Sequence, residues 1–307
     1  MKNFLNQFTL VTLALLVFAC SKKNEAVVPT SINDIKDSVF VKNGRMVFAE
    51  ISNYENMVKD TTSREKTFRS VSSENFFSLA TNSSKASVNA SLYDSKFLQR
   101  VLNQDGIVQI GEWIIKVDLA KSLCFVLNKK HENEYVDLVK ENSSNTHISS
   151  YSTDENVLEL LASHQSSAKT NGLFCKDRSA RVKKDEGFEY LNVAQTLRLD
   201  CKVVYQKAGI YFSLQGKIKA QEKIAGVWFQ KGLRMDLSYA YSLNVRCGYY
   251  DTNSGSTGAS DNNEQSYRPY ESARGLENYS YAIRLGVYNP EGGGLFYVTR
   301  LYQISDY

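Results

Sequence analysis

The sequence has few of the residues that mark common catalytic and metal sites. Among its 307 residues there are only three histidines, His131, His147 and His164, and no two of them are four residues apart, as in a zinc-binding helix. CxxC spacings, a GxSxG nucleophile elbow and a glycine-rich phosphate loop are also missing. We therefore expect solvated histidines, no catalytic residue, no metal site and no cofactor.

Concentrated charge and long apolar runs are scarce as well. The net charge is +4, and no run of five or more Lys or Arg residues occurs. A nucleic-acid-binding protein gathers its positive charge into a patch or stripe, so nucleic acid is not an expected partner. Beyond residue 19, no apolar run approaches the roughly 18 residues of a transmembrane helix.

The first 20 residues have the layout of an export signal. Lys2 supplies a positive start, Phe4 to Phe18 is mostly apolar, and the small Ala19 directly precedes Cys20. The ending LVFAC resembles the lipobox of bacterial lipoproteins. This resemblance implies cleavage before Cys20, a lipid on its sulfur and anchoring of the protein to a membrane through that lipid.

The remainder divides into a short tether and two larger parts. We assign 1–19 to the signal peptide, 20–31 to the lipidated cysteine and polar tether, 32–170 to an α+β domain and 171–307 to a β domain. The boundary is placed near residue 170 because Glu141 to Gly172 is rich in Ser, Asn and Thr.

In the first domain, Asn43-Gly44 between two apolar runs predicts a β-hairpin. Ile107 to Asn128 predicts three successive strands, and a helix is expected after a cap at Ser152 or Thr153. The stretch DGIVQIGEWIIKVD, from Asp105, resembles segments of uncharacterised exported lipoproteins of Bacteroidota, which implies no known activity.

In the second domain, apolar and polar residues alternate along five runs. They begin at Arg198, Ile210, Met235, Tyr279 and Leu295. Such alternation with short connections predicts an antiparallel β-sandwich-like domain, so the whole chain is expected to be mainly β. Asp251 to Gly275 is expected to be a long loop.

Four cysteines remain after Cys20, which permits two disulfides in an oxidising compartment. Cys124 and Cys201 lie inside strand patterns and can be small buried hydrophobes. A Cys175–Cys247 disulfide is favoured, because it would tie the start of the sandwich to a distant strand end. The alternative is Cys201–Cys247, across two sheets.

Aromatic residues supply the main binding candidates, since the chain has 19 tyrosines and two tryptophans. Tyr239 and Tyr241 fall in the apolar phase of their strand and are expected in the core. Residues in positions that favour exposure could stack on sugar rings. They are Trp228, Tyr211, Tyr250 and Tyr288.

These features predict a lipid-anchored extracytoplasmic protein that binds a ligand or serves envelope structure. The expected partners are the membrane, through the lipid, and a glycan or envelope protein. The expected location is the outer membrane, with the periplasmic and surface faces both open. The alternative is a polysaccharide hydrolase with paired carboxylates, for which Asp185, Glu186 and Glu189 are candidates.

Overall fold

The computed structural model describes residues 38–71, 76–81, 92–165, 184–245, 250–288, 294–298 and 300–306. The predicted signal peptide, the tether and the domain boundary near residue 170 lie outside these ranges. Among the described residues, no helix combines the length and apolar character needed to span a bilayer.

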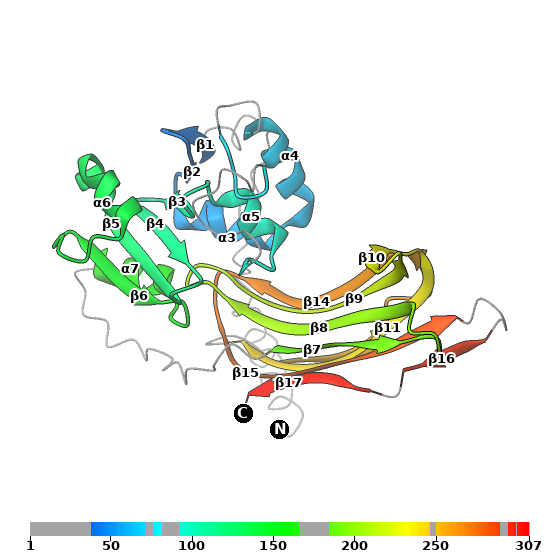
Figure 1. The fold of residues 1–307 in the computed structure, drawn as a ribbon. Helices are drawn as coiled ribbons and strands as arrows, with labels where there is room; N and C mark the ends of the chain where they lie inside the picture. The colour runs from blue at the N-terminus through cyan, green and yellow to red at the C-terminus, as the bar shows by residue number, and fades with distance from the viewer. Residues whose placement is uncertain are drawn as a thin grey trace, which may run out of the picture. The chain divides into compact units, whose positions relative to one another are not determined.

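The described chain up to Gln165 is built on a six-stranded sheet whose strands follow chain order (Figure 1). Neighbouring strands are antiparallel, except that β2 and β3 are parallel. The strands are β1 (Val39–Lys42), β2 (Arg45–Phe48), β3 (Ile107–Ile110), β4 (Trp113–Asp118), β5 (Leu123–Asn128) and β6 (Ile148–Ser152).

Two sequence predictions are confirmed in this sheet. Asn43 and Gly44 both have positive φ, 51° and 72°, as a two-residue turn matched to the strand twist requires. The run from Ile107 to Asn128 forms β3, β4 and β5, as expected.

Short helices accompany this first sheet. They are α3 (Ile51–Lys59), α4 (Thr61–Val71), α5 (Lys96–Val101), the 3-10 helix η2 (Lys129–Glu134), α6 (Tyr135–Lys140) and α7 (Val157–Gln165). The cap expected at Ser152 or Thr153 is wrong. Ser152 ends β6, where it pairs with Leu123, and the helix begins only at Val157.

Two more sheets make up the second part. In one, here called the second sheet, the order is β10-β9-β8-β7, and β14 also pairs with β9. In the third sheet the order is β12-β11-β15-β16, with β13 on β11 and β17 on β15. All of these pairs are antiparallel.

The strands of the second sheet are β7 (Lys184–Tyr190), β8 (Leu197–Lys207), β9 (Phe212–Ile224), β10 (Val227–Gln230) and β14 (Glu264–Ser272). Those of the third are β11 (Leu233–Val245), β12 (Tyr250–Ser256), β13 (Ser260–Asn262), β15 (Leu276–Tyr288), β16 (Leu295–Tyr297) and β17 (Tyr302–Asp306). The long strands of these two sheets are curved along their length (Figure 1).

One apolar core joins the second and third sheets. Leu199 and Ile218 from the second sheet pack in the same buried cluster as Leu237 and Ile283 from the third. Two sheets enclosing a shared core constitute a sandwich, so the prediction of a mainly β chain with an antiparallel sandwich-like second part is confirmed.

The prediction of a long loop from Asp251 to Gly275 is wrong. This segment contains most of β12 and all of β13 and β14 rather than one long loop. Polar residues dominate β12 and β13, and most of them are exposed on both faces, so hydrophobic alternation could not reveal these strands. Their edges instead pair with the long strand β11.

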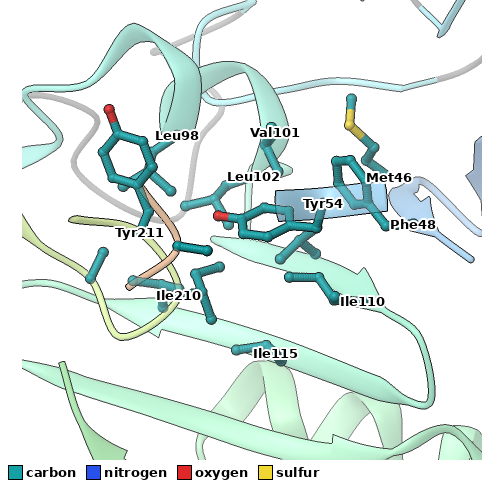
Figure 2. Close-up of a cluster of buried hydrophobic side chains, with 14 of the residues drawn as sticks. Met46, Phe48, Tyr54, Leu98, Val101, Leu102, Ile110, Ile115, Ile210 and Tyr211 are labelled. Carbon is teal, nitrogen blue, oxygen red and sulfur yellow. The ribbon is translucent and has the colours of Figure 1, made fainter. Parts of the chain in front are cut away.

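The first part has its own core, and a turn from the sandwich completes it. Ala208, Ile210 and Tyr211, from the β8–β9 connection, belong to the same buried cluster as Tyr54, Phe97 and Val101. Figure 2 shows Ile210 and Tyr211 beside Leu98 and Leu102 of the α5 region. The described residues between Ser38 and Asp306 belong to one compact unit.

Candidate functional site

The outer face of the second sheet presents the most distinctive set of exposed side chains. On β8, Leu199, Cys201 and Val203 face the sandwich core, so the intervening Arg198, Asp200 and Lys202 project from the opposite face. On β9 the same alternation gives that face Lys217, Lys219, Gln221 and Lys223.

Three aromatic rings lie together on this face and are called the aromatic group: Phe188, Tyr190 and Trp228. The ring centroids of Phe188 and Tyr190 are 5.2 Å apart, and those of Tyr190 and Trp228 are 6.4 Å apart. Phe188 is 47% exposed and Tyr190 42% exposed, while Trp228 is half-buried. Such exposed rings are apolar surfaces available to a ligand.

Arg198 lies at the centre of the aromatic group. Its guanidinium carbon is 4.1 Å from the Trp228 ring centroid and 5.1 Å from that of Phe188. Its Nε donates to Gln221 Oε1 at 3.0 Å and pairs with Asp200 Oδ1 at 2.9 Å. The neighbouring strands therefore hold the guanidinium plane against both rings, which fixes the geometry of the group.

A cavity of about 490 Å³ adjoins Phe188 and Arg198 on the same face. Its volume is within the range of small-molecule binding sites. Its charged lining consists of Arg198, Lys202, Lys217 and Lys219 with Asp94, Glu186 and Asp200. Asp94 comes from the segment before α5 and forms an ion pair with Lys202, so the first part of the chain closes one side of the cavity.

The carboxylates of the cavity each have a cationic partner. Glu186 pairs with Lys184 at 2.6 Å, and Asp200 pairs with Arg198. Burial raises the pKa of Asp200, and the positive charge of Arg198 opposes that shift. The two other carboxylates that the sequence suggested face the third sheet, where Asp185 binds Arg300 and Glu189 accepts from Tyr302.

Of the aromatic residues predicted to contact a glycan, only Trp228 belongs to this face. Tyr250 is 66% exposed, but it lies on β12 of the third sheet, where its hydroxyl accepts from Ser242. Tyr288 is half-buried on β15, with Arg234 over its ring at 4.7 Å. The structure therefore does not bring these two tyrosines to the same sheet as Trp228.

The expected exposure of Tyr211 is wrong. Its side chain is 0% exposed, and its ring stacks on Phe97 at a centroid distance of 5.4 Å. The period-two alternation failed here because Tyr211 precedes β9 and lies in the turn that enters the first core. In contrast, Tyr241 is buried against the sandwich core and Tyr239 packs partly against it, as expected.

The prediction that Cys124 and Cys201 are small buried hydrophobes is confirmed. Cys124 and Cys201 are buried and free of disulfides. Cys20, Cys175 and Cys247 lie outside the described residues, so lipidation and the Cys175–Cys247 disulfide stay predictions.

Sequence reasoning missed Phe188, Tyr190 and Arg198 as candidate site residues. The segment around Asp185 resembled a charged approach to the first strand, whereas it is strand β7 itself. The available signal was the alternation of Glu186, Phe188 and Tyr190 with Asp185, Gly187 and Glu189. It was obscured because neither face of β7 is consistently apolar.

Known protein families and curated proteins were compared with the chain, and none matches it.

Proposed function

We propose that this protein is a lipid-anchored extracytoplasmic binding protein that recognises a carbohydrate chain on the outer face of its second sheet. The observation that carries the proposal is the aromatic group with Arg198 fixed at its centre, beside a cavity lined by charged side chains. Trp228, predicted from the sequence as a glycan contact, belongs to that group.

The chemistry of a sugar matches both parts of this face. A pyranose ring has an apolar C–H face that packs on an aromatic ring, while its hydroxyls accept and donate hydrogen bonds. Trp228 would supply the stacking surface. Arg198, Gln221 and Asp200 would bond to the hydroxyls, and the lysines of the cavity would favour sugars that carry acidic groups.

The test is a glycan array probed with the whole chain in detergent, followed by titration calorimetry with a glycan that the array retains. Trp228→Ala should weaken binding by roughly 5- to 30-fold, because loss of a stacked ring costs about 1–2 kcal/mol. Tyr250→Ala is the matched control, an exposed aromatic residue on the third sheet, and it should bind as the wild type does. Equal binding by wild type and Trp228→Ala would contradict the proposal.

A hydrolase is the second candidate, supported by three carboxylates in one cavity and by the raised pKa of Asp200. A carboxyl that holds its proton can act as a general acid. Incubation of the bound glycan with the protein separates the two functions. New reducing ends that Asp200→Asn abolishes would establish hydrolysis, whereas an unchanged glycan supports binding alone.

The proposed anchor is the lipid on Cys20, and we propose the outer membrane as its location. Ser21 follows the cysteine in place of the aspartate associated with inner-membrane retention. Cells expressing Cys20→Ala should release the protein into the soluble fraction, and continued tight membrane association would contradict the anchor. Protease treatment of intact cells then distinguishes surface from periplasmic display.

A further inference from the structure

Two histidines, His131 and His147, lie together beside the first sheet. His131 lies in η2, and His147 lies in the turn before β6, yet their rings stack with centroids 3.7 Å apart and planes 15° apart. Both rings direct Nδ1 toward Glu134. Nδ1 of His147 is 2.9 Å from Glu134 Oε1, and Nδ1 of His131 is 3.7 Å from the same oxygen.

We propose that His131, Glu134 and His147 form a binding site for a divalent transition metal, with Zn²⁺ as the ion of choice. One ligand atom from each residue lies within 4.8 Å of the other two. In a tetrahedral zinc site the metal–ligand bonds are about 2.0–2.2 Å, which separates neighbouring ligand atoms by roughly 3.3–3.6 Å. The distances of 2.9 and 3.7 Å lie on either side of that value.

Local structure accounts for the convergence. His131 stands at a kink inside η2, where its φ of −108° and ψ of 28° depart from helical values, and Glu134 ends the same segment three residues later. The η2 segment starts on a cap in which the Asn128 side chain accepts from the Lys130 amide. His147 follows the η2–α6 segment in the chain. It directly precedes Ile148, the first residue of β6, which pairs with Leu127 of β5.

Asn145 is a positioning residue for the site. Its side-chain amide donates to Glu134 Oε2 at 2.8 Å and to Asp137 Oδ2 at 2.9 Å. Its side-chain oxygen accepts from the backbone amide of His147 at 2.9 Å. Glu134 can thus keep Oε2 on Asn145 while Oε1 binds the metal, an outer contact of the kind that orients metal ligands.

The charge and exposure of the cluster also suit a cation. The Glu134 carboxylate brings a negative charge within reach of both imidazole rings. The side chains of His131, Glu134 and His147 are 37%, 21% and 46% exposed, so water can complete the coordination sphere. Two imidazoles and one carboxylate form a mixed N/O set that zinc accepts, and copper and nickel would compete.

The experiment uses the whole chain, purified without a polyhistidine tag and stripped of metal, and titrated with ZnCl₂ by calorimetry. One equivalent should bind with a dissociation constant in the micromolar range or tighter. His131→Ala, His147→Ala and Glu134→Gln should each weaken binding at least tenfold, and Asn145→Ala should weaken it by a smaller factor. His164→Ala is the matched control and should leave binding unchanged.

A second measurement on the unaltered protein decides the result if a variant misfolds. With ¹⁵N-labelled histidine, ring resonances of two of the three histidines should move on addition of zinc, and His164→Ala should remove only the unmoved one. The proposal is overturned if no single equivalent binds, if His131→Ala/His147→Ala binds zinc as wild type does, or if the ring of His164 responds instead.

Discussion

The hydroxyl of Tyr211 donates a hydrogen bond of 2.6 Å to the carboxylate of Glu271 and accepts one of 2.8 Å from Ser95. Tyr211 and Glu271 belong to the sandwich, but Ser95 caps α5 in the first part of the chain. Arg64 of α4 reaches the same carboxylate at 3.2 Å. This buried polar network, together with the apolar turn next to it, connects the first core to the sandwich.

Tyr211→Phe tests the network without changing the shape of the ring. We expect the free energy of unfolding to fall by about 1–2 kcal/mol, because the buried Ser95 hydroxyl loses its acceptor and Glu271 loses a donor. Urea denaturation measures this loss. Tyr250→Phe removes an exposed hydroxyl from the third sheet and should change stability by less than about 0.5 kcal/mol. Equal effects from the two variants would show that the network contributes nothing.

Gly209 is the tightest point of the turn that enters the first core. Its φ is +71°, and a Cβ there would lie 2.6 Å from Cys124 Sγ and 2.9 Å from Val157 Cγ2. Gly209→Ala should therefore cost more than about 2 kcal/mol, from backbone strain and the clash combined. Thermal or urea unfolding gives the value.

Gly226 provides the matched control for Gly209. It also has positive φ, +86°, but its Cβ position has no heavy atom within 4 Å. Gly226→Ala should cost only the strain of about 1 kcal/mol. If the two variants lose the same free energy of unfolding, the close approach of residue 209 to Cys124 adds no measurable cost.

Glu132 makes stability depend on acid pH. Hydrogen bonds from Lys42 and Arg45 lower the pKa of its carboxyl from 4.5 to about 2. The ionised form therefore stabilises the fold above pH ~4.5, and that contribution is lost as pH falls toward 2. Glu132→Gln should cost roughly 2 kcal/mol at pH 7, where it leaves the buried Arg45 guanidinium without a carboxylate partner, and the difference from wild type should shrink between pH 5 and pH 2.

The control for this pH dependence is Glu112→Gln. Glu112 forms an ion pair with Lys129 in which both side chains are at least 40% exposed, so its removal should change stability by less than about 0.5 kcal/mol. Urea unfolding at several pH values measures both variants. A pH-independent difference between Glu132→Gln and wild type would be inconsistent with the lowered pKa.

The cysteines can be assigned by thiol chemistry. Burial raises the pKa of the Cys201 thiol to about 12 and that of Cys124 as well, so neither should react with a thiol reagent in the native protein. Both should react on unfolding, and non-reducing peptide mapping should show Cys175 linked to Cys247. A linked peptide that contains Cys201 would support the alternative pairing and contradict the free, buried thiol.

Patterns with a strong local cause were predictable from the sequence. Asn43-Gly44 determines a turn because both residues tolerate positive φ, and the alternation in β8, β9, β11 and β15 follows from one face of each strand entering the core. The outer face of the second sheet was only partly predictable, since Trp228 was identified but its neighbours Tyr190 and Arg198 come from other strands.

Features that depend on long-range contacts were not predictable. Tyr211 is buried because α5 and the first sheet surround a turn, which no local periodicity records. The strands β12 and β13 are held by pairing with β11 rather than by apolar residues of their own. His131 and His147 are 16 residues apart in sequence, and only the path of the chain through α6 brings their rings together.

The insertion of residues 208–211 into the first core has a consequence for the order in which the two parts can fold. When the first 165 residues have emerged, the buried positions around Phe97 and Val157 still lack the side chains of Ala208, Ile210 and Tyr211. That half can collapse early, but it retains an open apolar seam until more than 40 further residues have followed. Completion of the first hydrophobic core therefore awaits the β8–β9 connection, so the first part alone should remain sensitive to proteolysis until residues 208–211 are in place.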